Sequence, residues 1–406
     1  MTVIPVRPLW AGRTAVVVGI LLLALNLRTA VAVLSPILGL VSEDIPLGSL
    51  GIGLLGMLPP LAFAASGFVA PLVARRIGLE LTLVLASCAM VAGPLIRAVA
   101  PSYPVLVAGS VVVLAGMGFA NIVLPPVIKK YFPDRVGLLT ATYLTVMSIS
   151  AAVPPLIAAP LADAIGWRPT VGAWGLLALA AIVPWLVVLS QHRAQDRSAE
   201  GAVVAPPALL GRMGRSRVAW AIALMFAVTS LNVYGMFAWL PELLIDVAGS
   251  SPAEAGAMLS LYALIGLPAG LLIPVLAPRL RNVGWLVAVG IVLYLLGYLG
   301  LLLAPTPATV LWVVLIGAGP LLFPLALVLV NLRTRSHQAS AALSGFVQGI
   351  GYAVGALGPL VIGVIHDLTG QWSAVLLFLV GTALLVSVSA VLLVKPRTVE
   401  EELGLS

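Results

Sequence analysis

Arg28 is the residue of this sequence best suited to chemistry, because it lies near the middle of a long apolar run over residues 15–40. Such a run spans a bilayer, and an arginine at its centre costs at least about 2.5–3.5 kcal/mol to insert. The guanidinium stays protonated and offers a planar fork of donors for carboxylate-like and other small planar anions. We expect Arg28 to bind an anionic solute in a central cavity. The alternative is a structural role, in which Arg28 pairs with helix-end carbonyls or with another helix.

Helical geometry sorts the other polar residues of this run. Asn26 and Arg28 are separated by about 200° around an α-helix, whereas Arg28, Ala32 and Ser35 share one face. We therefore assign Arg28 and Ser35 to the cavity. Asn26 stays a substrate-binding candidate whose main expected use is a hydrogen bond between helices.

Further polar and aromatic side chains lie in other apolar runs. Gln348 and Tyr352 are four residues apart, so they share a helix face and are expected to line the cavity. We expect glycines of the same run to form its close-packing surface; these are Gly345, Gly349 and Gly355. The weaker cavity candidates are Asn121, Tyr143, Thr145, Ser148, Trp239 and Tyr262. Thr145 and Ser148 have the alternative of bonding back to their own helix.

The composition excludes an ordinary soluble domain. The chain has 406 residues, of which 61% are hydrophobic and only 9% are charged. This balance predicts an all-α polytopic membrane protein. The single cysteine, Cys88, excludes an intrachain disulfide and a cysteine-rich metal site.

The apolar runs predict twelve transmembrane helices in two sets of six. The predicted spans are 15–40, 50–73, 81–99, 103–128, 137–162, 168–190, 218–244, 253–277, 284–304, 308–332, 339–365 and 372–394. We expect an N-terminal six-helix bundle over 1–190, a cytoplasmic linker over 191–217 and a C-terminal bundle over 218–406.

The basic residues predict the orientation. All but three of the 21 lysines and arginines fall at the amino terminus, in the even-numbered connections or after the last span. This bias places both termini in the cytoplasm, so we expect a multi-pass protein of the cytoplasmic (inner) membrane. The exceptions are Arg28, Arg97 and Arg168. The bias also accounts for the net charge of +7 without nucleic acid. Arg97 could funnel anions, but a position among lipid headgroups is the expectation.

The two halves repeat each other. Leu25-Asn26-Leu27-Arg28 matches Leu231-Asn232-Val233-Tyr234 at an offset of 206, and Leu114-x-Gly116-x-Gly118 matches Leu315-x-Gly317-x-Gly319 at 201. Pro155, Asp163 and Gly166 match Pro359, Asp367 and Gly370 at 204. Two six-helix repeats with a midplane site are the major facilitator arrangement. Tyr234 is then the mate of Arg28, and Asn232 that of Asn26.

These motifs resemble the cyanate and 2-nitroimidazole transporter family within the major facilitator superfamily. The matching segments are Asn26-Leu27-Arg28, Ala70-Pro71-Leu72 with Arg75-Arg76-x-Gly78-x-Glu80, Leu231-Asn232-x-Tyr234 with Trp239-Leu240-Pro241, and Gln348-Gly349-x-Gly351-Tyr352 through His366-Asp367-x-Thr369-Gly370-x-Trp372. The resemblance implies a secondary transporter of a small anion or small polar heterocycle that works by alternating access without a cofactor. We expect a monomer.

Two smaller sets of residues concern coupling and gating. Glu242 and His366 are the coupling candidates, because no carboxylate lies at mid-membrane depth. Uniport or exchange is at least as well supported as proton coupling. Arg75, Arg76 and Glu80 are the gating candidates, although the superfamily's acid before the arginines is missing.

Three other functions remain to be weighed. An efflux protein for hydrophobic compounds would use the same fold and have little use for Arg28. A sensor would bind the solute without moving it. A membrane-embedded enzyme is disfavoured, because three histidines and one cysteine give no nucleophile–base pair or metal set.

Overall fold

The structure, a computed structural model, describes residues 13–191, 211–280 and 282–404. The chain forms two compact units: unit 1 comprises Met1–Leu47 and Ala62–Gly201, and unit 2 comprises Gly48–Leu61 and Ala202–Ser406. The helix α4 (Ser49–Ile77) contributes residues to both units. Most of the expected linker, residues 192–210, lies outside the described residues.

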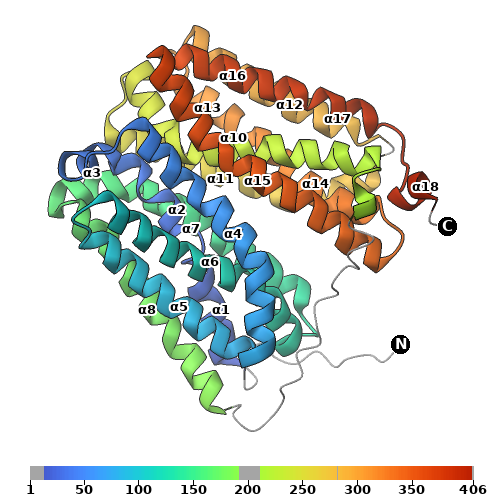
Figure 1. The fold of residues 1–406 in the computed structure, drawn as a ribbon, viewed down its shortest axis with the longest axis horizontal. Coiled ribbons are helices and arrows are strands. Elements are labelled where there is room, and N and C mark those ends of the chain that lie inside the picture. Colours follow the sequence, from blue (N-terminus) through green and yellow to red (C-terminus); the bar gives the residue numbers. More distant parts are fainter. Residues whose placement is uncertain (1–12, 192–210, 281, 405–406) are drawn as a thin grey trace. The chain divides into compact units, whose positions relative to one another are not determined.

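Unit 1 is a bundle of long helices whose first member is interrupted (Figure 1). Its elements are α1 (Thr14–Ala24), α2 (Thr29–Ala32), the short 3₁₀ helix η1 (Ser35–Ile37), α3 (Leu38–Asp44), the second half of α4, α5 (Leu79–Ala98), α6 (Tyr103–Tyr131), α7 (Val136–Ile165) and α8 (Trp167–Gln191). Helix α5 packs against α6 and α8, and α1 packs against α8.

Unit 2 is a second bundle, in which α10 and α15 pack closely along each other. Its elements are the first part of α4, α10 (Arg217–Ala248), α11 (Pro252–Leu276), η2 (Ala277–Arg279), α12 (Gly284–Leu303), α13 (Thr309–Ala318), η3 (Gly319–Leu321), α14 (Leu322–Leu332), α15 (His337–Thr369), α16 (Trp372–Leu385), α17 (Ser387–Leu392) and α18 (Val399–Leu403).

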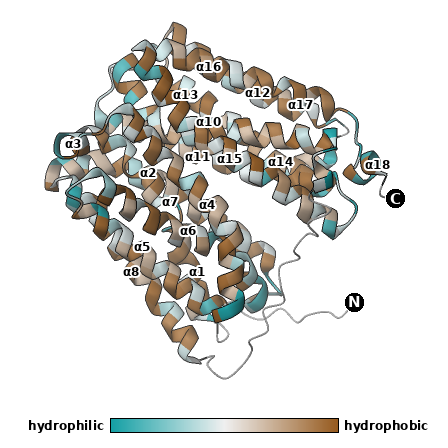
Figure 2. Cartoon of the chain, viewed as in Figure 1, coloured by the Kyte–Doolittle hydropathy of each residue, from teal (hydrophilic) through white to brown (hydrophobic). Residues whose placement is uncertain are grey.

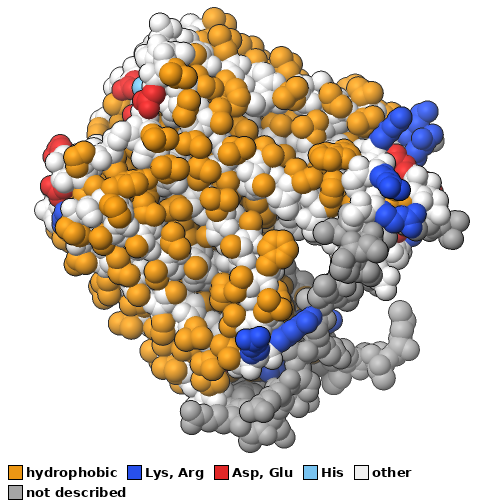
Figure 3. Space-filling model, viewed as in Figure 1, with side chains coloured by type: hydrophobic (Ala, Val, Ile, Leu, Met, Phe, Trp, Pro, Cys, Tyr) orange, Lys and Arg blue, Asp and Glu red, His pale blue; other side chains and the backbone are white. Residues whose placement is uncertain are grey.

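Twelve stretches of the described chain are long and apolar enough to cross a membrane. Figure 2 shows hydrophobic residues along the helices and hydrophilic ones gathered at helix ends, for example near α3 and α18. In Figure 3 the visible surface is mostly hydrophobic, and lysine and arginine side chains cluster near helix ends. Such a surface suits lipid contact, and the prediction of twelve spans is confirmed.

The first span is broken where a continuous helix was expected. After α1 the chain turns through residues 25–28, and a second interruption separates α2 from η1. Pro36 lacks an amide hydrogen, so it cannot donate to a carbonyl four residues earlier. The Asn26 amide donates to the Leu22 carbonyl at 2.8 Å, a local bond that competes with regular helix. Arg28, the residue directly before α2, has non-helical backbone with φ −131° and ψ −6°.

Side-chain contacts recur at corresponding places in the two units. The Asn232 amide donates to the Val228 carbonyl at 2.8 Å, as Asn26 does to Leu22. Each unit also has a tryptophan indole donating to an aspartate near the end of its first span: Trp167 to Asp44 at 2.9 Å and Trp372 to Asp246 at 2.8 Å.

The glycine that precedes each of these tryptophans supports the same repeat. Gly166 and Gly370, matched in the sequence, end α7 and α15 with positive φ angles of 85° and 65°. Both adopt backbone that favours glycine. The repeat inferred from sequence offsets is thus visible as shared local chemistry.

The glycines matched between the two halves at an offset of 201 do not occupy corresponding places in the structure. Gly116 lies against the Ala86 carbonyl of α5, and Gly118 lies against Ser66 of α4. In unit 2 the order is reversed, because Gly317 lies against α11 at Tyr262 and Gly319 lies against α12. Contacts pair Gly116 with Gly319, at an offset of 203 rather than 201.

The last helix fastens the ends of two long helices of unit 2. The Glu402 carboxylate accepts from the Ser216 hydroxyl at 2.7 Å and the Val218 amide at 3.1 Å, at the start of α10. The Glu400 carboxylate accepts from the Arg335 amide at 2.8 Å and the Ser336 amide at 3.1 Å, before α15. Each carboxylate satisfies helix-terminal donors and opposes the positive end of the helix dipole.

Replacing Glu402 by glutamine is therefore expected to destabilise unit 2 by about 1 kcal/mol, because α10 loses a charged acceptor at its first turn. Thermal unfolding of the detergent-solubilised protein measures this loss. Glu43→Gln is the control, since Glu43 is exposed at the end of α3. Equal unfolding temperatures for the two variants would contradict the role given to Glu402.

Candidate functional site

Arg28 in unit 1 is half-buried and has unused hydrogen-bonding capacity. Its guanidinium carbon lies 5.0 Å from the centre of the Phe63 ring on α4, a cation–π arrangement. Among the described residues, no carboxylate forms an ion pair with Arg28 and none of the side-chain hydrogen bonds includes it. The guanidinium can therefore offer its donors to a solute.

Tyr143 on α7 lies within electrostatic range of Arg28 and is largely buried, with 7% of its surface exposed. Arg28 thus has an aromatic face beside it, that of Phe63, and interacts electrostatically with the tyrosine Tyr143. Sequence reasoning had Arg28 and Tyr143 but missed Phe63, since one phenylalanine in an apolar helix carries no distinguishing signal.

The remaining unit 1 candidates have varied surroundings. Asn26 is buried in the turn after α1, and its side chain donates to the Leu22 carbonyl of that helix. Thr145 and Ser148 bond back to the Ala141 and Leu144 carbonyls at 2.9 Å and 3.1 Å, the local alternative foreseen for them. Ser35 is buried in η1, and Asn121 is half-buried on α6.

In unit 2, Asn232 belongs to an internal polar network. Its oxygen accepts from the Tyr298 hydroxyl at 2.6 Å, and its amide donates to the Thr382 hydroxyl at 3.2 Å. All three side chains are buried. The network joins α10, α12 and α16, so the geometry gives Asn232 an interhelical bonding role.

Trp239 and Tyr262 are also turned into the interior of unit 2. Trp239 is fully buried, and its indole donates to the Pro359 carbonyl at 2.8 Å. Tyr262 is 3% exposed, and its hydroxyl has no partner among the described residues. Its ring meets Phe237 edge-on, with centres 5.7 Å apart. Both residues pack α10 against neighbouring helices.

The three other candidates of unit 2 are half-buried on the closely packed helices α10 and α15. Gln348 donates to the Ser344 hydroxyl at 2.7 Å. The Tyr352 ring meets Phe226 edge-on at 5.3 Å. Tyr234 lies beside Gly355, where an added methyl group would be 3.5 Å from its ring.

The coupling candidates lie with other charged groups near one end of α10 and α15. Glu242 is half-buried and interacts electrostatically with Asp246 and Asp367. The His366 ring lies 4.2 Å from that of Trp372, centre to centre. Sequence reasoning placed Glu242 and His366 near the same membrane surface, but it did not identify their neighbours.

Among the gating candidates, Glu80 bonds towards α6. Its carboxylate accepts from the Lys130 ammonium at 2.9 Å and the Tyr131 hydroxyl at 2.7 Å, and its residue is 8% exposed. Arg75 and Arg76 are exposed at the end of α4. Glu80 thus ties α5 to α6 at the same end of unit 1.

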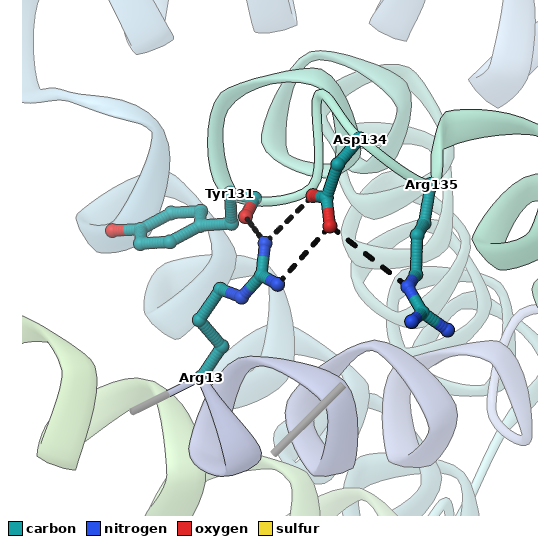
Figure 4. A network of polar contacts seen from close by, with 4 residues as sticks. All are labelled: Arg13, Tyr131, Asp134 and Arg135. Carbon is teal, nitrogen blue, oxygen red and sulfur yellow. Dashed lines mark hydrogen bonds and ion pairs between the residues drawn. The ribbon is translucent and has the colours of Figure 1, made fainter. Parts of the chain in front are cut away.

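A second polar network at this end was missed by sequence reasoning (Figure 4). Arg13 donates to Asp134 through two nitrogens, at 2.8 Å and 3.3 Å, and to the Tyr131 carbonyl at 2.8 Å. Arg135 lies 3.8 Å from the same carboxylate. The only sequence signal was an aspartate, Asp134, among basic residues. The network fastens the start of α1 to the connection between α6 and α7.

Twelve apolar helices define a polytopic membrane protein, and one of its two bundles holds a half-buried arginine that forms no ion pair among the described residues. The chain matches the sequence profile of the Major Facilitator Superfamily over residues 20–356. It therefore belongs to that superfamily, and it is a transporter of small solutes, not an enzyme.

Relatives match nearly the whole chain. It is 34% identical to the 2-nitroimidazole transporter of Escherichia coli (strain K12), over 93% of this chain and 94% of that protein. It is 32% identical to the uncharacterized transporter YycB of Bacillus subtilis (strain 168), over 90% and 89%. It is 25% identical to the cyanate transport protein CynX of E. coli (strain K12), over 87% and 90%. These matches confirm the family resemblance seen in the motifs.

The solved structures confirm the facilitator fold. An inward-facing bacterial homolog of the human lysosomal transporter Spinster superposes with a TM-score of 0.71 at 16% identity, covering 99% of this chain and 97% of that one.

Proposed function

We propose that this protein moves a small polar or anionic solute, a cyanate-like anion or a small nitro-heterocycle, across the cytoplasmic membrane by alternating access. The observation that carries the proposal is Arg28, whose half-buried guanidinium has no acceptor among the described side chains. Relatives that match most of the chain are named as transporters of 2-nitroimidazole and of cyanate. Both solutes are small, cyanate being linear and 2-nitroimidazole a flat ring, and both present acceptors that a guanidinium fork can bind.

The neighbours of Arg28 support a planar solute in particular. Phe63 offers an aromatic face beside the cation, and Tyr143 offers a hydroxyl that donates or accepts. An anion would pair with Arg28, whereas a neutral nitro-heterocycle would accept from Arg28 and stack on an aromatic ring. In carriers made of two six-helix repeats, rocking of one repeat against the other then exposes the solute alternately.

The proposal is tested by uptake into proteoliposomes of labelled cyanate, labelled 2-nitroimidazole and a labelled hydrophobic cation. We expect saturable uptake of at least one planar solute and none of the hydrophobic cation beyond protein-free vesicles. Transport of the hydrophobic cation alone would favour drug efflux. Binding of a planar solute without flux would favour a sensor.

Coupling is a separate part of the proposal. Facilitated movement or exchange needs no titrating group, so an uncoupler should leave equilibrating uptake intact. If an uncoupler abolishes accumulation, Glu242 and His366 are the residues to replace first. Both are titratable, and each lies near the C-terminal end of its helix, α10 or α15.

A further inference from the structure

Arg97 was expected among lipid headgroups, but it lies inside unit 1 with only 3% of its surface exposed. Its Nε donates to the Ser110 hydroxyl on α6 at 2.8 Å, and its Nη1 donates to the Ala30 carbonyl on α2 at 3.0 Å. None of the ion pairs among the described residues includes it. A buried arginine without a carboxylate is costly, so these two contacts must matter for the fold.

The Ala30 carbonyl needs this donor because the first span is interrupted between α2 and η1. In a continuous helix Leu34 would donate to it, but the α-helical hydrogen bonding of α2 ends before η1 begins, although Val33 and Leu34 keep helical dihedral angles. None of the main-chain hydrogen bonds formed by the described residues at this break ends on Ala30. A free carbonyl at membrane depth finds no water. Arg97 therefore supplies the hydrogen-bond donor that the Ala30 carbonyl lacks at the break.

Helix α6 is shaped to receive the Arg97 side chain. A methyl group on Gly109 would lie 2.9 Å from the Arg97 amide nitrogen and 3.1 Å from its Cγ, so only glycine leaves room. The Ser110 hydroxyl donates its own hydrogen to the Leu106 carbonyl at 2.7 Å. Its oxygen is thereby oriented to accept from Arg97.

We propose that Arg97 is a positioning residue for Arg28, acting through the main chain of α2. Ala30 follows Arg28 by two residues, so a fixed Ala30 carbonyl fixes the start of α2 and the direction in which Arg28 leaves the backbone. Arg97 itself does not touch the solute. The inference rests on the proposed role of Arg28, but its structural part stands on the break alone.

Hydrogen exchange of the purified full-length protein tests the structural part, read on peptides that cover residues 25–34. Arg97→Met should raise exchange there about tenfold or more, since a charge-assisted bond at the break is lost. Arg97→Lys should restore part of the protection, because its ammonium still reaches a carbonyl. In proteoliposomes, Arg97→Met should raise the KM for the transported solute more than it lowers the maximal rate.

Arg333→Met is the matched control. Arg333 is 5% exposed in unit 2 and donates to the Leu393 carbonyl at 2.9 Å. Its loss should leave exchange at residues 25–34 unchanged. A folded Arg97→Met protein with wild-type exchange there would overturn the proposal. If that variant does not fold, Ser110→Ala decides: exchange should rise about threefold, and no rise overturns the proposal. Absence of any solute uptake by wild type would defeat the proposed function and leave the exchange result valid.

Discussion

Replacing Arg28 by glutamine is expected to lower uptake of an anionic solute about 100-fold, because two charge-assisted hydrogen bonds are worth roughly 3 kcal/mol in total. Arg28→Lys keeps the charge but loses the planar fork, so we expect about a tenfold loss. Arg28→Ala should match the glutamine variant for an anion. Initial rates of labelled cyanate uptake into proteoliposomes of equal protein content measure these effects.

The control for this series is Arg168→Gln. Arg168 is another arginine of unit 1, but it donates to the Ala98 and Ala100 carbonyls at 3.3 Å and 2.7 Å and pairs with Asp44 at 3.3 Å. The Arg168→Gln protein should fold, and it should transport the solute at nearly the wild-type rate. Normal rates in all three Arg28 variants would remove Arg28 from the site. If the variants lose transport of anions but still transport a neutral heterocycle, Arg28 recognises the charge of the solute.

Replacing Gly358 by alanine is expected to destabilise unit 2 by about 2–3 kcal/mol, because the added methyl group overpacks a backbone contact. It would lie 2.4 Å from the Leu231 carbonyl oxygen and 3.1 Å from the Leu231 Cα. Neither atom belongs to a flexible side chain, so α10 and α15 must move apart. Thermal unfolding in detergent measures the loss.

Gly349 provides a control on the same helix. No atom lies within 4 Å of the position that a methyl group on Gly349 would take. Gly349→Ala should therefore be neutral or slightly stabilising, since alanine costs less chain entropy in a helix than glycine. Identical unfolding temperatures for the two alanine variants would show that α15 does not approach the Leu231 backbone of α10 closely at Gly358.

The glycines of α15 show what sequence can predict about such a helix. A slim helix was expected from Gly345, Gly349 and Gly355, and close packing does occur, with Gly355 lying against Ser230. Gly349, however, faces open space, and Gly351 and Gly358 make the tight approaches. Composition reveals that a helix packs closely, but the face that packs depends on its neighbours.

The first span, α1 to α3, likewise shows how far the candidate site could be predicted from the sequence. The mid-membrane position of Arg28 could be read from the sequence and predicted a polar site, but the interruptions of this span were not predicted. At the break over residues 25–28 the Asn26 side chain makes a local bond, and at the second break Arg97 donates to the Ala30 carbonyl. Arg97 sits 67 residues after Ala30, so no local pattern links them. The twelve spans were predictable because bilayer thickness sets their length and apolarity.

The most direct measurement of transport is counterflow of labelled cyanate into proteoliposomes preloaded with unlabelled cyanate. Alternating access by a carrier that binds the anion at Arg28 predicts a transient overshoot of label in wild-type vesicles, and its disappearance in Arg28→Gln vesicles. An overshoot of equal size in the variant would contradict a role for Arg28. Equilibration without any overshoot in wild type would contradict carrier-mediated exchange of this anion.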